Sequence, residues 1–201
     1  MKTMKIAILA AATAAVFAGT EARAASNTVA DTVAPYTTTL NAPVDLDFRI
    51  RIPAFLFFQV GTAGATVDQV DFTPTPTEVQ SSTPVTSSNT VSVTLRGNSG
   101  AISITPTNNS GGTGLSNGAG STINYSTISA AVTAGDAQLA PPALSNAGGT
   151  ASNVPVSAGQ VTNRTATWSF TYTPGAGVVP PAGDYGTAAN GGRVTYTASM
   201  P

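Results

Sequence analysis

The stretch that most constrains the fold is residues 44–61, VDLDFRIRIPAFLFFQVG, because no other segment carries so much apolar volume in so regular a pattern. Its first nine residues alternate between apolar and charged, and a period of two is typical of a strand with one face on a core. The apolar set is Val44, Leu46, Phe48, Ile50 and Ile52, and the charged set is Asp45, Asp47, Arg49 and Arg51. The pattern predicts a core strand over residues 44–52.

Pro53 cannot donate to a sheet ladder, so it predicts a bend or a change of partner strand. The nearly unbroken apolar run that follows, from Phe55 to Val60, predicts a second strand buried on both faces. Fully burying one large apolar side chain contributes about 1.5–3 kcal/mol. The two strands are therefore expected to supply a large share of the hydrophobic stabilisation.

The first 24 residues have the features of a secretory signal peptide. Lys2 and Lys5 precede an apolar segment over residues 6–19, and a small-x-small cleavage pattern ends at Ala24. Later stretches are too short in apolar residues for a membrane-spanning helix, so no transmembrane segment is expected in the exported chain. The predicted organisation is a signal peptide over 1–24, an N-terminal leader over 25–40 and a β-sandwich domain over 41–201.

The composition after the signal excludes several chemistries. The chain from residue 25 has no Lys, His or Cys, and its charges are five arginines and eight acidic residues. Nucleophile systems that pair Ser or Cys with His or Lys lack a partner, as do zinc sites built on His or thiolate. Five scattered arginines cannot form a nucleic-acid-binding patch. We expect no enzyme activity, no cofactor, no metal and no nucleic-acid partner.

The rest of the chain alternates short strand patterns with Gly, Pro, Ser and Asn loops, which predicts an all-β, antiparallel, immunoglobulin-like β-sandwich. Residues 91–95 and 102–104 predict a β-hairpin across a glycine-containing loop. Trp168 is expected in the core, with stacking on a sugar as the alternative. The predicted core comprises Leu46, Phe48, Ile50, Phe55, Phe57, Val93, Ile104, Trp168, Phe170 and Tyr196.

Residues 25–36, ASNTVADTVAPY, are open to two interpretations. They are either a frayed terminus or plain edge strand, or a donor strand that completes the sheet of a neighbouring subunit. Twelve extended residues reach about 40 Å at roughly 3.3 Å each, which is enough to lie along a partner. Val29 and Val33 are the candidate donor side chains.

Asp45 and Asp47 could form a glycosidase carboxylate pair or part of a calcium site, because same-face neighbours on a strand lie about 7 Å apart. Arg49 and Arg51 continue the same face, so we interpret the four residues as an alternating, solvated charged surface. A carboxylate-dependent hydrolase is kept only as a minor hypothesis.

Several features together resemble a pilin of the bacterial chaperone-usher fimbriae, of the archaic and alternative branches. They are the cleaved signal, the extended leader, the Phe- and Ile-rich strand ending in proline, the Thr-rich strands, and PPAGDYG at 180–186 followed by VTYTASMP at 194–201. The resemblance implies a cell-surface fimbria (pilus) subunit that acts in cell adhesion, an incomplete sandwich completed by strand addition.

Several further expectations come from that resemblance. The C-terminal strand, with Val194, Tyr196, Ala198 and Met200, would form the edge that contacts a periplasmic chaperone and then the next subunit. The partners would be other copies of the chain in a homopolymer, the chaperone and an outer-membrane usher, and export would run through the periplasm to the cell surface. The alternative function is a secreted, monomeric β-sandwich module that binds glycan or matrix.

Overall fold

The computed structural model describes residues 26–32, 34–36, 39–64 and 66–201. The predicted signal peptide and Val33 lie outside the described residues. The chain divides into two compact units, Met1–Ile52 and Pro53–Pro201.

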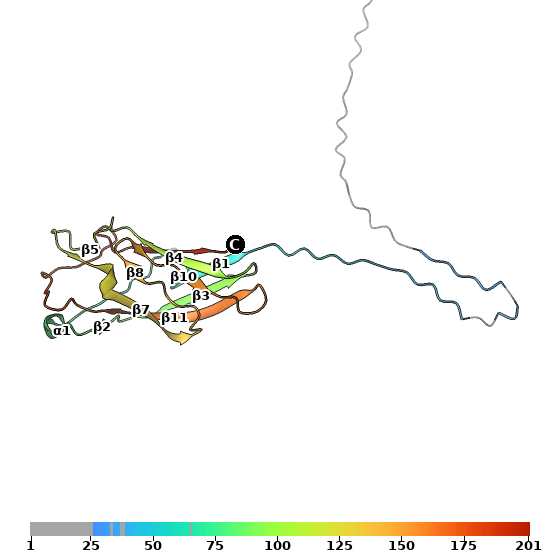
Figure 1. Cartoon of the computed structure of the whole chain (residues 1–201), viewed down its shortest axis with the longest axis horizontal. Helices are drawn as coiled ribbons and strands as arrows, with labels where there is room; N and C mark the ends of the chain where they lie inside the picture. The colour runs from blue at the N-terminus through green and yellow to red at the C-terminus, as the bar shows by residue number, and fades with distance from the viewer. Residues whose placement is uncertain (1–25, 33, 37–38, 65) are drawn as a thin grey trace, which may run out of the picture. The chain divides into compact units, whose positions relative to one another are not determined.

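The second unit is built almost entirely of strands in antiparallel sheets (Figure 1). Its elements in chain order are β1 (Leu56–Val60), α1 (Pro76–Ser81), β2 (Val85–Thr86), β3 (Val91–Gly97), β4 (Ile102–Asn108), β5 (Leu115–Ser116), β6 (Thr122–Ile123), the 3-10 helix η1 (Tyr125–Thr127), β7 (Ile128–Gly135), β8 (Leu144–Ser145), β9 (Gly148–Gly149), β10 (Ser152–Val154), β11 (Thr162–Tyr172) and β12 (Val194–Ser199).

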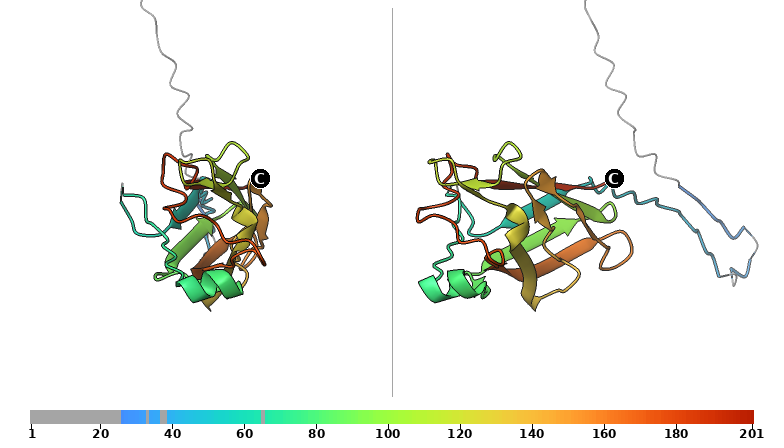
Figure 2. Two further views of the ribbon diagram at one scale, coloured as in Figure 1. Left: turned by 90° about the vertical axis from the view of Figure 1, so that its left-hand side faces the viewer. Right: turned by 60° about the vertical axis from the view of Figure 1, so that its left-hand side comes forward.

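Two sheets form the layers of the sandwich (Figure 2). In the larger sheet the long strand β11 pairs with β3, β7 and β2, and β1 pairs with the other edge of β3. The smaller sheet has the order β10-β4-β12. Every pairing is antiparallel. The predicted all-β, antiparallel sandwich is confirmed.

The core lies between these sheets and follows the period of two along the central strands. β3 buries every second residue, Val91, Val93 and Leu95, because successive side chains point to opposite faces of a strand. Trp168 of β11 is fully buried, and its indole Nε1 donates a hydrogen bond to the carbonyl oxygen of Leu139 at 2.8 Å. The prediction that Trp168 is a core residue is confirmed.

The predicted core is right for the central strands and wrong for the N-terminal part. Four of the predicted core residues are buried, namely Val93, Ile104, Trp168 and Phe170. Tyr196 is half-buried. Five predicted residues are exposed instead, namely Leu46, Phe48, Ile50, Phe55 and Phe57.

Residues 44–52 form no strand in the structure, although the pattern predicted a core strand there. They belong to the first unit, and the second unit begins at Pro53. Figure 1 draws residues 39–52 as an extended trace with no arrow. Alternation identifies a segment suited to a sheet, but it does not say which chain supplies the neighbouring strands.

β1 corrects the prediction of a strand buried on both faces. Leu56 and Phe57 are 39% and 46% exposed, whereas Phe58 and Val60 are half-buried and pack against the core. β1 pairs only with β3 within the described chain, so it is an edge strand with a single protected face.

The predicted hairpin over residues 91–104 is also wrong. β3 and β4 are consecutive, but they belong to different sheets and do not pair with each other. The loop over residues 98–101 therefore crosses from one layer to the other. Both strands alternate toward the same core, and a short glycine-containing loop allows this arch as well as a hairpin.

The short helix α1 was not predicted, although its sequence carries a capping box. The backbone amide of Thr75 donates to the Glu78 carboxylate at 2.6 Å, and the Glu78 amide donates to the Thr75 hydroxyl at 3.3 Å. The hydrogen bond from the Thr75 amide also lowers the pKa of Glu78. Pro76 at the first turn completes the start signal.

Candidate functional site

The C-terminal strand β12 is an open edge of the smaller sheet. Within the described residues it pairs with β4 alone, from Val194 opposite Asn108 to Ser199 opposite Ser103. Its odd-numbered residues are exposed, and Val194, Tyr196 and Ala198 are half-buried. An edge strand keeps one row of backbone groups available for pairing with another strand.

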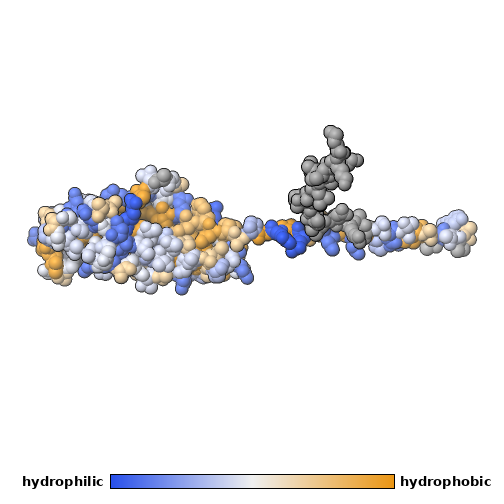
Figure 3. Space-filling model, turned by 90° about the horizontal axis from the view of Figure 1, so that it is seen from above, coloured by the Kyte–Doolittle hydropathy of each residue, from blue (hydrophilic) through white to orange (hydrophobic). Residues whose placement is uncertain are grey.

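The open edge of β1 lies close to β12 (Figure 2). Five half-buried side chains pack against the core at this place. They are Phe58, Val60, Tyr196, Ala198 and Met200, and we call them the β1–β12 seam. Seen from above in Figure 3, part of the sandwich surface carries a concentration of apolar, orange atoms. The seam thus combines two open edges with apolar side chains that are only partly covered.

Tyr196 connects the seam to the centre of the core. Its ring makes an edge contact with Trp168, with ring centroids 5.5 Å apart. Burial, with a smaller contribution from Tyr125, raises the pKa of Tyr196 to about 12. A residue that covers Tyr196 from outside would therefore extend the core rather than rest on polar surface.

Gly97 makes room for the C-terminal end of the seam. It lies opposite Leu56 in the β1–β3 pairing. A Cβ atom on Gly97 would lie 2.8 Å from the Met200 Sδ and 3.1 Å from the Ile102 Cδ1. The absence of a side chain at Gly97 lets Met200 pack against the start of β1.

The chain enters β1 in an extended form that Asn98 holds. The amide nitrogen of Phe55 donates to the Asn98 side-chain oxygen at 2.9 Å, and the Asn98 side-chain nitrogen donates to the carbonyl oxygen of Pro53 at 2.9 Å. The side chain therefore takes the place of a neighbouring strand for these two residues. Residues 53–55 show no bend before β1, so the first of the two alternatives predicted at Pro53 is wrong. The second, a change of partner strand, stays a prediction, because residues 44–52 form no strand.

The first unit carries the matching apolar feature. The alternating residues of segment 44–52 are among the most exposed large apolar side chains described, with Phe48 and Ile50 each 86% exposed and Ile52 78% exposed. Leu46 and Val44 are 69% and 56% exposed. So regular an exposed apolar row makes segment 44–52 a candidate interaction surface.

The donor residues predicted from the leader, Val29 and Val33, offer less apolar surface than segment 44–52. Val29 is 41% exposed, and Val33 lies outside the described residues. Val29 is a smaller side chain than Leu46, Phe48 or Ile50, so it buries less area on a partner. The predicted edge residues Val194, Tyr196 and Ala198 lie on β12, and Met200 follows it directly.

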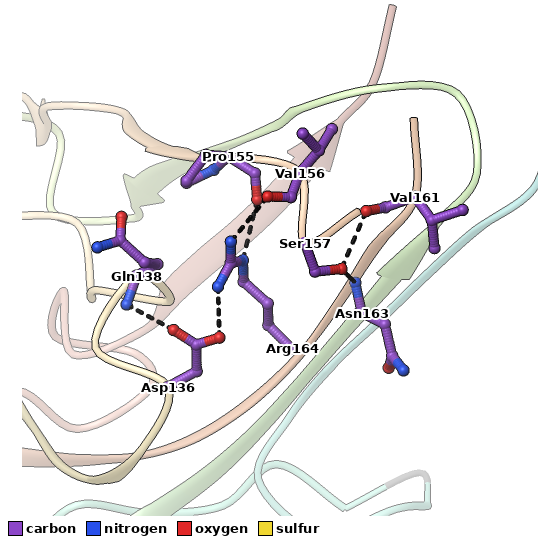
Figure 4. Close-up of polar contacts among 8 residues, drawn as sticks. All are labelled: Asp136, Gln138, Pro155, Val156, Ser157, Val161, Asn163 and Arg164. Carbon is purple, nitrogen blue, oxygen red and sulfur yellow. Dashed lines mark hydrogen bonds and ion pairs between the residues drawn. The ribbon is translucent and has the colours of Figure 1, made fainter. Parts of the chain in front are cut away.

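A polar cluster that the sequence did not predict lies at the start of β11 (Figure 4). The Arg164 side chain is 10% exposed and forms an ion pair with Asp136. Its Nε and Nη2 donate to the carbonyl oxygens of Pro155 and Val156, both at 2.9 Å. Through these contacts Arg164 holds the loop before β11 against the residue that follows β7, and so stabilises the fold.

The hydrogen bond from the Gln138 backbone amide lowers the pKa of Asp136, and the hydrogen bond and charge of the Arg164 guanidinium lower it further. Asp136 and Arg164 are 28 residues apart, and no local pattern connects them. Only the β7–β11 pairing brings the two side chains together.

Nothing in the described residues forms a metal site, since no three His, Cys, Asp or Glu side chains are grouped to hold an ion. Asp45 and Asp47 are exposed. In the part of the chain that the structure describes, no helix has the length and apolar character needed to cross a bilayer.

Comparisons with protein-family models, with curated proteins and with solved structures return no match. The chain's own geometry is therefore the basis for any functional proposal.

Proposed function

We propose that this chain is a structural subunit of a bacterial surface fibre, and that residues 44–52 of one copy add as a strand to the β1–β12 seam of the next. The observation that carries the proposal is the exposed row Val44, Leu46, Phe48, Ile50 and Ile52, which alternates like a core strand but has no strand partner among the described residues. Strand addition would give the row a core to cover.

The lengths of the two partners agree. Side chains that alternate on one strand face are spaced by roughly 6.6 Å, so the five donor residues span about 26 Å. The four residues from Val194 to Met200 on the acceptor edge span about 20 Å by the same spacing. A donor strand can therefore cover the edge along its whole length.

A donor strand that pairs antiparallel with β12 is expected to come from another copy. β1 is antiparallel to β3, β12 is antiparallel to β4, and the loop over residues 98–101 reverses the chain between β3 and β4, so β1 and β12 run in opposite directions. A donor antiparallel to β12 then runs parallel to β1. Parallel neighbours need a crossover of a dozen or more residues, whereas three residues separate Ile52 from β1.

The open seam also supports a need for protection before assembly. An unpaired edge strand beside apolar side chains is a site for aggregation. A periplasmic chaperone that covers this edge, and an usher that releases it to the next subunit, fit that need.

The test is an unboiled denaturing gel, because exchanged strands resist SDS until heated. Phe48→Asp should abolish the heat-sensitive ladder, whereas Asp47→Asn, on the opposite face of the segment, should keep it. Deletion of residues 25–36 should also leave the ladder, because the donor row begins at Val44. Loss of the ladder with this deletion and not with Phe48→Asp would contradict the assignment of the donor.

A second pair of variants separates donor from acceptor. Ala198→Glu should block the seam and leave the donor intact, and Phe48→Asp should do the reverse. Each variant alone should run as a monomer on the unboiled gel, and a mixture should give one heat-sensitive dimer band, which also shows that both variants fold. A single monomer band from the unmodified chain would support the monomeric binding module instead.

A further inference from the structure

We propose that segment 44–52 also pairs with the same segment of a second copy, as an antiparallel ribbon centred on Phe48. The charges of the segment change sign symmetrically about Phe48: two acidic residues precede it, Asp45 and Asp47, and two basic residues follow it at the same spacings, Arg49 and Arg51. The inference uses the segment proposed as donor strand, but it does not depend on insertion into the seam.

Antiparallel pairing about Phe48 brings every charge opposite its complement. Asp45 then faces Arg51 of the other copy, and Asp47 faces Arg49, so the ribbon gains four opposite-charge pairs. On the other face Phe48 lies opposite itself, and the remaining apolar residues pair as Val44 with Ile52 and Leu46 with Ile50. Opposite charges directly across a strand pair are stabilising.

Other arrangements of the same two segments are worse. Parallel pairing in register places Asp on Asp and Arg on Arg, which is destabilising. An antiparallel shift by two residues places either Asp47 opposite itself or Arg49 opposite itself. A shift by one residue puts the charged face of one strand beside the apolar face of the other. The sequence therefore specifies one register.

The charges find no such complement at the seam. The neighbouring strands are LFFQV in β1 and VTYTAS in β12, and neither contains a charged residue. The exposed residues of β12 beside an added strand are Thr195, Thr197 and Ser199. Insertion into the seam thus uses the apolar row and gives the symmetric order of the charges no role, whereas self-pairing uses both faces of the segment.

All four charged side chains are exposed, and the segment has no strand partner in the described chain, so it is available to a second copy. A ribbon of two strands is marginal when its apolar face is uncovered. The self-paired dimer is therefore the weaker state, which holds donor segments in pairs until an open seam competes for them.

Cysteine crosslinking tests the register, because the exported chain has no natural cysteine. Phe48→Cys should form a disulfide-linked dimer under mild oxidation, since position 48 faces itself. Leu46→Cys alone and Ile50→Cys alone should not crosslink, because each like pair lies about 13 Å apart in the ribbon, beyond disulfide reach. A mixture of the two should crosslink. Equal crosslinking of all three single variants, or of none, would overturn the proposal.

Charge reversal tests the cause. Asp45→Arg with Asp47→Arg makes the segment fully basic, and Arg49→Asp with Arg51→Asp makes it fully acidic. Each double variant should weaken self-pairing at least tenfold by sedimentation, and a mixture of the two should restore it. The variant with all four charges exchanged should pair like the natural chain. Unchanged self-association of the fully basic variant would overturn the inference.

The two proposals fail separately. Neither charge-reversed variant should lose the SDS-resistant ladder, since the seam strands are uncharged. A ladder that persists without position-48 crosslinking would leave the fibre proposal and remove the ribbon. Crosslinking at position 48 without any SDS-resistant ladder would contradict the fibre proposal and support the self-paired ribbon.

Discussion

The backbone amide of Phe55 donates a hydrogen bond to the side chain of Asn98 at 2.9 Å, across 43 residues of sequence. Because Asn98 also binds the carbonyl oxygen of Pro53, one side chain fixes the direction in which the chain enters the sandwich. The residues that Asn98 binds, Pro53 and Phe55, lie between the segment proposed as donor, 44–52, and strand β1 at the seam.

Asn98→Ala should loosen this entry without unfolding the sandwich. Both hydrogen bonds are exposed, so the expected loss of stability is about 0.5–1.5 kcal/mol. Hydrogen exchange at the Phe55 amide should become at least tenfold faster, while the amides of β3 and β11 stay protected. Asn163→Ala is the matched control, since Asn163 donates to the Ser157 hydroxyl through its backbone amide, which the substitution keeps. Unchanged exchange at Phe55 would show that another group holds the segment.

The lowered pKa of Asp136 predicts a loss of stability in acid. A carboxyl group with a depressed folded-state pKa stabilises the fold above its ordinary value of 3.8, and this contribution disappears as the pH falls through the lowered value. Asp136→Asn should be less stable than the natural chain at pH 7 and should lose less stability between pH 4 and pH 2. Urea unfolding followed by circular dichroism measures both, with exposed Asp184→Asn as the control. Parallel acid profiles for the natural chain and Asp136→Asn would contradict the prediction.

Gly135 is expected to tolerate no side chain. It has a φ of +84°, and a Cβ atom would lie 2.5 Å from the carbonyl oxygen of Thr165 and 2.9 Å from the Ala166 Cα. These are backbone atoms of the paired strand β11, so they cannot move aside without disturbing the sheet. Gly135→Ala should cost at least about 3 kcal/mol, from left-handed strain of roughly 1–2 kcal/mol and the backbone clash.

Gly111→Ala isolates the strain from the clash. Gly111 has a φ of +62°, with nothing within 4 Å of a built Cβ, so its substitution should cost only the strain of about 1–2 kcal/mol. Thermal unfolding of the two variants compares them directly. Equal destabilisation would mean that the sheet at Thr165 yields to the added methyl group.

The sequence predicted the sandwich and its central strands because their alternation reflects the core they bury. Val93, Ile104, Trp168 and Phe170 each sit within a period-two pattern, and each is buried. The same rule failed for Phe48 and Ile50, which alternate equally well but are exposed. Period-two alternation indicates that one face of a strand packs on a core, but it does not say whether that core belongs to the same molecule or to another one.

The candidate site was predicted in part. Tyr196 and Ala198 were placed on the terminal strand by local alternation, and they lie there. The sequence predicts donor side chains at Val29 and Val33, whereas the larger exposed apolar side chains lie in segment 44–52, whose pattern predicts a core strand. The seam itself depends on how β1 and β12 approach each other across two sheets, and no local signal in either strand specifies that arrangement.

Tyr125 provides a test at alkaline pH. Its hydroxyl donates to the carbonyl oxygen of Gly191, it is 2% exposed, and burial raises its pKa from 10.0 to about 12. A raised folded-state pKa means that the unfolded chain gives up its proton first, so the stabilising contribution is complete below pH 10 and is lost as the pH rises toward 12. Tyr196 acts in the same direction.

Beyond residue 24 the chain has neither lysine nor cysteine, so tyrosines dominate its titration in this range. Tyr125→Phe should cost about 1–3 kcal/mol at pH 7, because the Gly191 carbonyl loses a buried donor, and it should lose less further stability between pH 10 and pH 12. Tyr185→Phe is the control, since that hydroxyl donates to Pro181 at an exposed site. Urea unfolding at pH 7, 10 and 11.5 measures the difference. If Tyr125→Phe and the natural chain lose equal stability in alkali, the buried Tyr125 hydroxyl does not resist ionisation, and the alkaline loss comes from the other tyrosines whose pKa burial raises, Tyr172 and Tyr196.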